Sequence, residues 1–140
     1  MITYWQQEAE KICRIEKDSL NSELKTWVDA RIVTRDDVEL LQKEFQIDPE
    51  HILDILDPDE QSRLEDGDGY VLTIIRLPIY DPNAETQYWT IPLGIIIKDN
   101  YIITICWMFL ICYIIVLTIS EWNNILFISF NFKYNVSHIF

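Results

Sequence analysis

Short runs of β-branched and aromatic residues open the chain, and each is bounded by polar or turn-forming residues. Such runs occur at residues 2–6, 11–15 and 26–30, and residues 18–22 between the last two have turn-like composition. β-Branched and aromatic side chains favour the pleated, half-buried surface of a sheet. The first thirty residues are therefore predicted to form three strands.

The spacing of hydrophobic positions changes to a helical period after residue 33. Val38, Leu41 and Phe45 fall at i, i+3 and i+7, which places them on one face of a helix. Thr34 can cap that helix, because its hydroxyl can accept from the amide three residues on. Asp48 and Pro49 then supply a cap and a first helical residue for a second, short helix, which ends before residue 58.

The middle of the chain returns to strands. An extended segment is predicted at residues 63–65, followed by turn chemistry at 66–69 and by a strand at Tyr70–Leu77 with nearly continuous apolar residues. Such continuity predicts a central strand buried on both faces. Residues 88–97 form the next strand, and 94–105 are predicted to be a hairpin. Together these elements predict an α/β fold, a three-layer unit in which a layered mixed sheet is flanked by helices.

The last forty residues have a different composition. Residues 101–120 carry no charge, and residues 101–140 contain no Gly, Ala, Pro, Gln, Asp or Arg. A helix over residues 102–119 would be long enough to approach the thickness of a bilayer, but residues 101–105 are also predicted as the second arm of the hairpin, and the remaining 106–119 are marginal for a span. This restricted amino-acid composition is also typical of AT-rich codons that are read out of frame. We therefore divide the chain into a domain at 1–106 and a hydrophobic tail at 107–140, either a membrane segment or an out-of-frame continuation.

Charge is concentrated in the first hundred residues, which hold 22 of the 23 acidic and 10 of the 11 basic side chains. The net charge of −12 would repel a phosphate backbone, so nucleic-acid binding is excluded, whereas cations are attracted. An odd number of cysteines without paired spacing is typical of a reducing compartment. The N-terminus lacks the basic and apolar regions of a signal peptide, so we expect the first half to be cytosolic.

The search for catalytic motifs finds none, and we expect no enzyme. With three glycines, at 67, 69 and 94, the chain cannot form a glycine-rich phosphate loop. His51, near the start of the second helix, is predicted to be a solvated surface residue. The acidic run that begins at Asp57 fails as a calcium loop, because Gln61 and Ser62 occupy its fifth and sixth positions.

An ordered series of short motifs extends over residues 2–106. The series is Trp27-Val28-Asp29, Leu40-Leu41, Glu44-Phe45, Ile47-x-Pro49-x-x-Ile52-x-Asp54-Ile55-Leu56-Asp57, Arg63-x-Glu65, Asp68-Gly69-Tyr70 with the strand to Pro78, Ile95–Lys98 and Asn100–Ile105. In this order and spacing it resembles the N-terminal cytosolic domain of the CorA family of magnesium and divalent-cation transporters.

The resemblance implies a homopentamer in the cell membrane, with residues 1–106 on its cytoplasmic side. It also implies that Asp54, the acid in the turn after the proline, helps to bind a weak, regulatory Mg²⁺ between neighbouring subunits. The partner acid lies on a long helix that has no counterpart here, so Asp54 would be half of a site. The Gly-Met-Asn motif of the pore is absent, since no glycine follows Gly94 and Met108 precedes Phe109. The similarity ends at Cys106.

Three interpretations follow. The first is a truncated CorA-like magnesium transport protein, a cytosolic Mg²⁺-sensing domain without pore helices. The second is a free-standing acidic interaction domain that joins full-length subunits. The third is a small single-pass membrane protein anchored by residues 102–119. A Gly-Met-Asn pore encoded just downstream in another reading frame would establish the first.

Overall fold

The computed structural model describes residues 1–8 and 11–108, all within one compact unit, Met1–Phe109. Apart from Trp107 and Met108, the predicted tail at 107–140 lies outside the described residues. No helix in the described part of the chain has the length and hydrophobicity needed to cross a bilayer.

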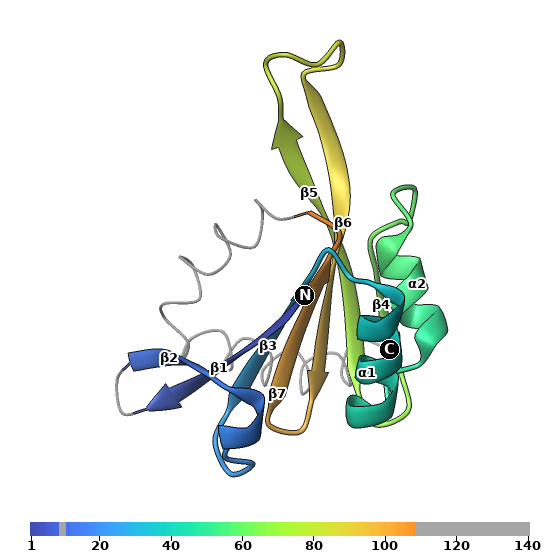
Figure 1. The fold of residues 1–140 in the computed structure, drawn as a ribbon. Helices are drawn as coiled ribbons and strands as arrows, with labels where there is room; N and C mark the ends of the chain where they lie inside the picture. Colours follow the sequence, from blue (N-terminus) through green and yellow to red (C-terminus); the bar gives the residue numbers. More distant parts are fainter. Residues whose placement is uncertain (9–10, 109–140) are drawn as a thin grey trace, which may run out of the picture. The chain divides into compact units, whose positions relative to one another are not determined.

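The elements appear in the predicted order (Figure 1). They are β1 (Ile2–Glu8), β2 (Lys11–Ile15), a 3₁₀ turn η1 (Lys17–Ser19), β3 (Thr26–Arg31), α1 (Arg35–Phe45), α2 (Pro49–Leu56), β4 (Arg63–Asp66), β5 (Val71–Tyr80), β6 (Tyr88–Lys98) and β7 (Tyr101–Cys106).

Both helices begin at the predicted caps. The Thr34 hydroxyl accepts from the amide of Asp37, and the Asp37 carboxylate accepts from the amide of Thr34, which completes a capping box. The Asp48 carboxylate accepts from the amide of Glu50, with Pro49 at the first helical position. These contacts satisfy amide groups that a helix leaves unpaired at its start.

The strands form one mixed seven-stranded sheet in the order β2-β1-β3-β7-β6-β5-β4. Neighbouring strands are antiparallel except β3 and β7, which run parallel because the chain between them crosses over through both helices. The predicted hairpin at 94–105 is confirmed: β6 and β7 pair from Gly94 with Ile105 to Lys98 with Tyr101.

Both helices pack on the same face of the sheet. Their buried residues Leu41, Phe45, Ile52 and Ile55 join one core with residues from β3, β5, β6 and β7. Over the described residues the fold therefore has two layers, a sheet and a helical layer, where three layers were predicted. The mixed sheet flanked by helices is confirmed: α2 lies over β6 and β7, and α1 lies beside α2 with Phe45 against Tyr101 of β7.

The predicted position of the strand at Tyr70–Leu77 was wrong. The centre of the sheet is β7, and β5 is second from the edge. Only alternate residues of β5, Leu72 and Ile74, are buried. The outer half of β5 pairs only with β6, in a ribbon that projects beyond the ends of β4 and β7, and no residue of that half is buried (Figure 1).

One close approach fixes the second helix on the sheet. Gly94, in β6, lies directly under Ile55 of α2, and a Cβ at position 94 would lie 2.9 Å from Ile55 Cγ2. No real side chain tolerates such a contact without a shift of its neighbours. The absence of a side chain at position 94 therefore lets α2 sit low on the sheet.

Candidate functional site

The outer side of α2 faces the edge strand β4 through two pairs of polar residues. His51 and Asp54 are three residues apart on the helix and so lie one above the other. Arg63 and Glu65 are two residues apart on the strand and point to the same side. The separation of the two helix residues matches that of the two strand residues, so Asp54 pairs with Arg63 and His51 pairs with Glu65.

Arg63 is the centre of this arrangement. Its Nη2 lies 2.6 Å from Asp54 Oδ2, and its Nε lies 2.9 Å from Glu65 Oε2. Its Nη1 contacts Glu60 Oε1 in the connection that precedes β4. We call these four residues the Arg63 cluster. One guanidinium with five N–H donors thus serves three carboxylates, which is the geometry for which arginine is suited.

The cluster changes the ionisation of its members. Hydrogen bonding to Glu65 first, and then to Glu60 and Asp54, raises the pKa of the Arg63 guanidinium above its ordinary value. The same bond to Arg63 lowers the pKa of the Glu65 carboxyl. The pKa of Glu60 is lowered first by the backbone amide of Gln61 and second by Arg63. The shifts of Arg63, Glu60 and Glu65 all favour the charged forms of these three groups.

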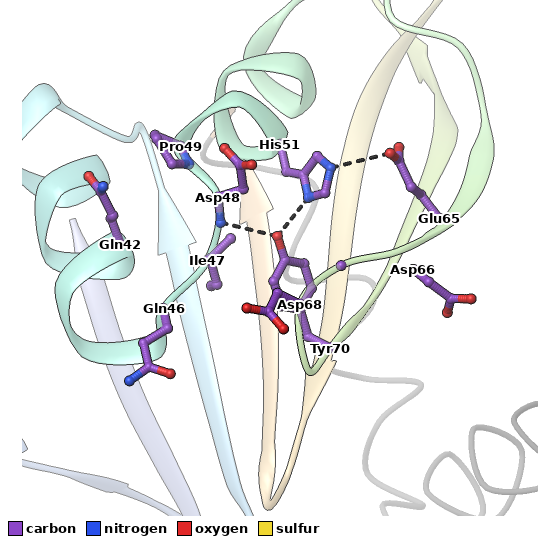
Figure 2. A pocket seen from close by; sticks show the side chains of 11 residues that line it. Gln42, Gln46, Ile47, Asp48, Pro49, His51, Glu65, Asp66, Asp68 and Tyr70 are labelled. Carbon is purple, nitrogen blue, oxygen red and sulfur yellow. Dashed lines mark hydrogen bonds and ion pairs between the residues drawn. The ribbon is translucent and has the colours of Figure 1, made fainter.

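His51 is not the solvated residue that the sequence predicted. Its side chain is 15 % exposed; Nδ1 lies 2.6 Å from the Tyr70 hydroxyl and Nε2 lies 3.3 Å from Glu65 Oε1 (Figure 2). Because Glu65 can only accept, a neutral ring carries its proton on Nε2 and accepts from Tyr70 at Nδ1. Tyr70 also accepts from the amide of Asp48, at 3.1 Å. The prediction failed because the turn at 66–69 folds Tyr70 back against the helix.

A cavity of about 580 Å³ lies beside this hydrogen-bonded chain, between the helices and the β4–β5 turn (Figure 2). Its lining includes the carboxylates of Asp48, Glu65, Asp66 and Asp68 and no lysine or arginine among the described residues. Tyr70 forms part of one wall of the cavity, and burial is the main cause that raises the pKa of its hydroxyl above the ordinary value. The full lining is Gln42, Gln46, Ile47, Asp48, Pro49, His51, Glu65, Asp66, Gly67, Asp68 and Tyr70.

Asp54, the predicted regulatory residue, lies outside this cavity, in the Arg63 cluster. Its side chain is 42 % exposed and its carboxylate is bound to Arg63. Within residues 1–8 and 11–108, no three His, Cys, Asp or Glu side chains are arranged to hold a metal ion. A single accessible carboxylate is compatible with one ligand of a hydrated Mg²⁺, and the other ligands would have to come from elsewhere.

The role of Arg63 was not predicted from the sequence. A signal was present: Arg63 is the single basic residue among six acidic ones between positions 57 and 68. In a segment of such charge, a lone arginine is the one available partner for its neighbours. The sequence did not show that an acid from the preceding helix would also reach it.

Comparison with known proteins adds the family and the fold. The family model for CorA-like Mg²⁺ transporter proteins matches residues 23–121, which is more than half of the chain. This match continues beyond Cys106, where the motifs recognised in the sequence end. No curated protein matches the sequence.

Solved structures share the fold at low sequence identity. The complete CorA magnesium transporter of Methanocaldococcus jannaschii gives a TM-score of 0.68 at 19 % identity and covers 89 % of this chain. The soluble domain of that protein gives 0.66 at 20 % identity over 86 % of this chain, and the full-length CmaX protein gives 0.65 at 16 % over 86 %. This chain spans 38 %, 46 % and 38 % of those three chains, respectively.

Proposed function

The chain belongs to the family of CorA-like Mg²⁺ transporter proteins, and we propose that residues 1–106 act as the cytoplasmic, Mg²⁺-responsive domain of a divalent-cation transport protein. The proposed role is regulatory and not catalytic. In it, several copies of the domain assemble at the membrane, as in the homopentamer that the family resemblance implies, and a hydrated Mg²⁺ binds weakly between neighbouring copies. Asp54 supplies one carboxylate to that ion.

The observation that supports this proposal is the position of Asp54. It lies on the outer side of α2, is 42 % exposed, and is held to the body of the domain by the buried Ile52 and Ile55 on the inner side of the same helix. A rigid helix thus presents an accessible acid to a neighbour. Mg²⁺ keeps most of its water and binds proteins through one or two carboxylates, so one acid from each of two partners is sufficient for weak, reversible binding.

The first test titrates Mg²⁺ into the full chain in detergent micelles and measures the heats by isothermal titration calorimetry at low and high salt. Wild type and Asp54→Asn should give the same weak heats, with millimolar affinity that falls as salt rises, because Asp54 is paired with Arg63 and the diffuse negative field alone attracts the ion. The matched control is Asp59→Asn, which removes an exposed acid in the connection between α2 and β4. Salt-insensitive, submillimolar binding that Asp54→Asn abolishes would contradict the half-site.

A second test supplies the missing partner. Residues 1–106 replace the matching part of the Methanocaldococcus jannaschii CorA transporter, and Mg²⁺ flux is measured in proteoliposomes at increasing internal Mg²⁺. The chimera should close as internal Mg²⁺ rises, and Asp54→Asn should require more Mg²⁺ for closure. If both chimeras conduct and close alike, Asp54 takes no part in regulation.

A further inference from the structure

Asp54 already has a positive partner inside its own domain. The guanidinium of Arg63 lies 2.6 Å from Asp54 Oδ2 and also contacts Glu60 and Glu65. An incoming divalent cation would therefore not meet a free carboxylate. It would meet one whose charge is neutralised by a tethered cation.

The same contact connects two elements that are otherwise weakly joined. β4 is an edge strand that pairs only with β5, through the four residues from Arg63 to Asp66. On its inner side it is linked to α2 by Arg63 with Asp54 and by Glu65 with His51. Loss of the Arg63 contact would leave β4 attached to the helix mainly through the His51 pair.

We propose that Arg63 is an internal counter-ion that competes with divalent cations for Asp54, so that cation binding at Asp54 displaces Arg63 and loosens β4 from α2. This inference rests on the proposed function, because it concerns the regulation of the same site. Arg63 is then a positioning residue, and β4 is the element that moves when the cation binds.

The geometry permits such an exchange. The Arg63 and Asp54 side chains are 29 % and 42 % exposed, and ion pairs in partly hydrated surroundings are weak enough to open. When Asp54 leaves, Glu60 and Glu65 still hold the guanidinium, so Arg63 moves to an alternative pairing and is not left without a counter-charge. A Mg²⁺ that keeps most of its water needs only one or two carboxylates, so the Asp54 carboxylate released by Arg63 and one acid of a neighbouring copy would be sufficient.

The test compares Arg63→Gln with Arg35→Gln in the full chain in detergent micelles. Arg35 forms an exposed pair with Glu39 on α1, so its removal changes the net charge equally and leaves the cluster intact. By calorimetry, Arg63→Gln should bind Mg²⁺ about three- to fivefold more tightly than Arg35→Gln, because an ion pair of modest strength no longer competes. The double variant Arg63→Gln with Asp54→Asn should lose this gain. Equal affinities for the two arginine variants would overturn the proposal.

Hydrogen exchange of the peptides that cover residues 60–66 provides the second readout. Arg63→Gln and Asp54→Asn should both exchange faster there than Arg35→Gln and Asp59→Asn, because each opens the link between β4 and α2 from one side. Circular dichroism checks that each variant is folded. Unchanged exchange in both would show that the contact does not hold β4.

The results separate this inference from the proposed function. If the Arg63 variants behave like their controls while Asp54 still regulates the transporter chimera, Arg63 is a passive surface partner and the proposed function stands. If Arg63→Gln tightens binding through Asp54 while the chimera ignores Asp54→Asn, the competition is real and the proposed regulatory role is wrong.

Discussion

The two sides of α2 differ in how they hold the helix. The inner side is apolar: Ile52 and Ile55 are fully buried, and Ile55 rests on the bare backbone of Gly94. The outer side carries His51 and Asp54, which are partly exposed and connected to β4 by charges and hydrogen bonds. The first kind of contact depends on shape and is sensitive to one methyl group, whereas the second depends on charge and can be rearranged by ions.

Under the proposed exchange, one short helix would be both fixed and responsive. Apolar packing on the inner side holds α2 on the sheet, and the charged side would exchange partners without moving the helix. A residue that senses a cation needs such a rigid base, because binding free energy would otherwise be lost in ordering the helix. Substitutions on the two sides should therefore differ in the size and in the kind of effect that they have on the domain.

The largest effect is expected on the inner side. Ile55→Ala should lower the free energy of unfolding by about 2–5 kcal/mol, because it removes buried methyl groups and leaves a cavity above Gly94. Leu53→Ala on the same helix is the control, since Leu53 is 58 % exposed and should change stability by less than about 0.5 kcal/mol. Urea unfolding of the full chain in detergent, followed by tryptophan fluorescence, measures both. Similar losses for the two variants would mean that α2 is not seated as the structure shows.

A smaller loss is expected when a methyl group is added under the helix. Gly94→Ala should cost about 1–3 kcal/mol, because its Cβ would overlap Ile55 and lift α2 from the sheet. The double variant with Ile55→Ala should cost less than the sum of the two single changes, since the new methyl then enters the space that Ile55 vacated. Additive losses would show that the two positions are not in contact.

The sequence predicted well those features that depend on local chemistry. Thr34 and Asp48 could be recognised as caps because a capping residue acts on amides within three positions of itself. The hairpin at 94–105 could be recognised because Asp99 and Asn100 interrupt two apolar runs. In the structure Asp99 has a left-handed backbone, with φ of 49°, which aspartate tolerates better than most residues.

Features that depend on distant partners were predicted poorly. The apolar run at 70–77 indicated a strand, but its place next to the edge of the sheet depends on where β4 and β6 pair. His51 was judged by its helix alone, and its burial comes from Tyr70, nineteen residues away. Asp54 was identified from the family pattern, but no local signal showed that Arg63 would bind it.

The smallest effect is expected from pH on the outer side. Bonding to Arg63 lowers the pKa of Glu65 in the folded chain below its ordinary value of 4.5, so the ionised form is favoured by folding. The stability that Glu65 contributes is therefore complete above pH 4.5 and is lost as pH falls through the lowered folded value. Glu65→Gln should be slightly less stable than wild type at pH 7, and the difference should shrink toward pH 3.

The matched control is Glu39→Gln, which removes one carboxylate from the exposed pair with Arg35, 3.4 Å apart. Because that pair is isolated and solvated, Glu39→Gln should cost less than Glu65→Gln at pH 7. Thermal unfolding of the three proteins at pH 7, 5, 4 and 3 measures the differences. A Glu65→Gln deficit that stays constant down to pH 3 would show that Glu65 supports the domain by packing, and its bond to Arg63 would then be an incidental surface contact.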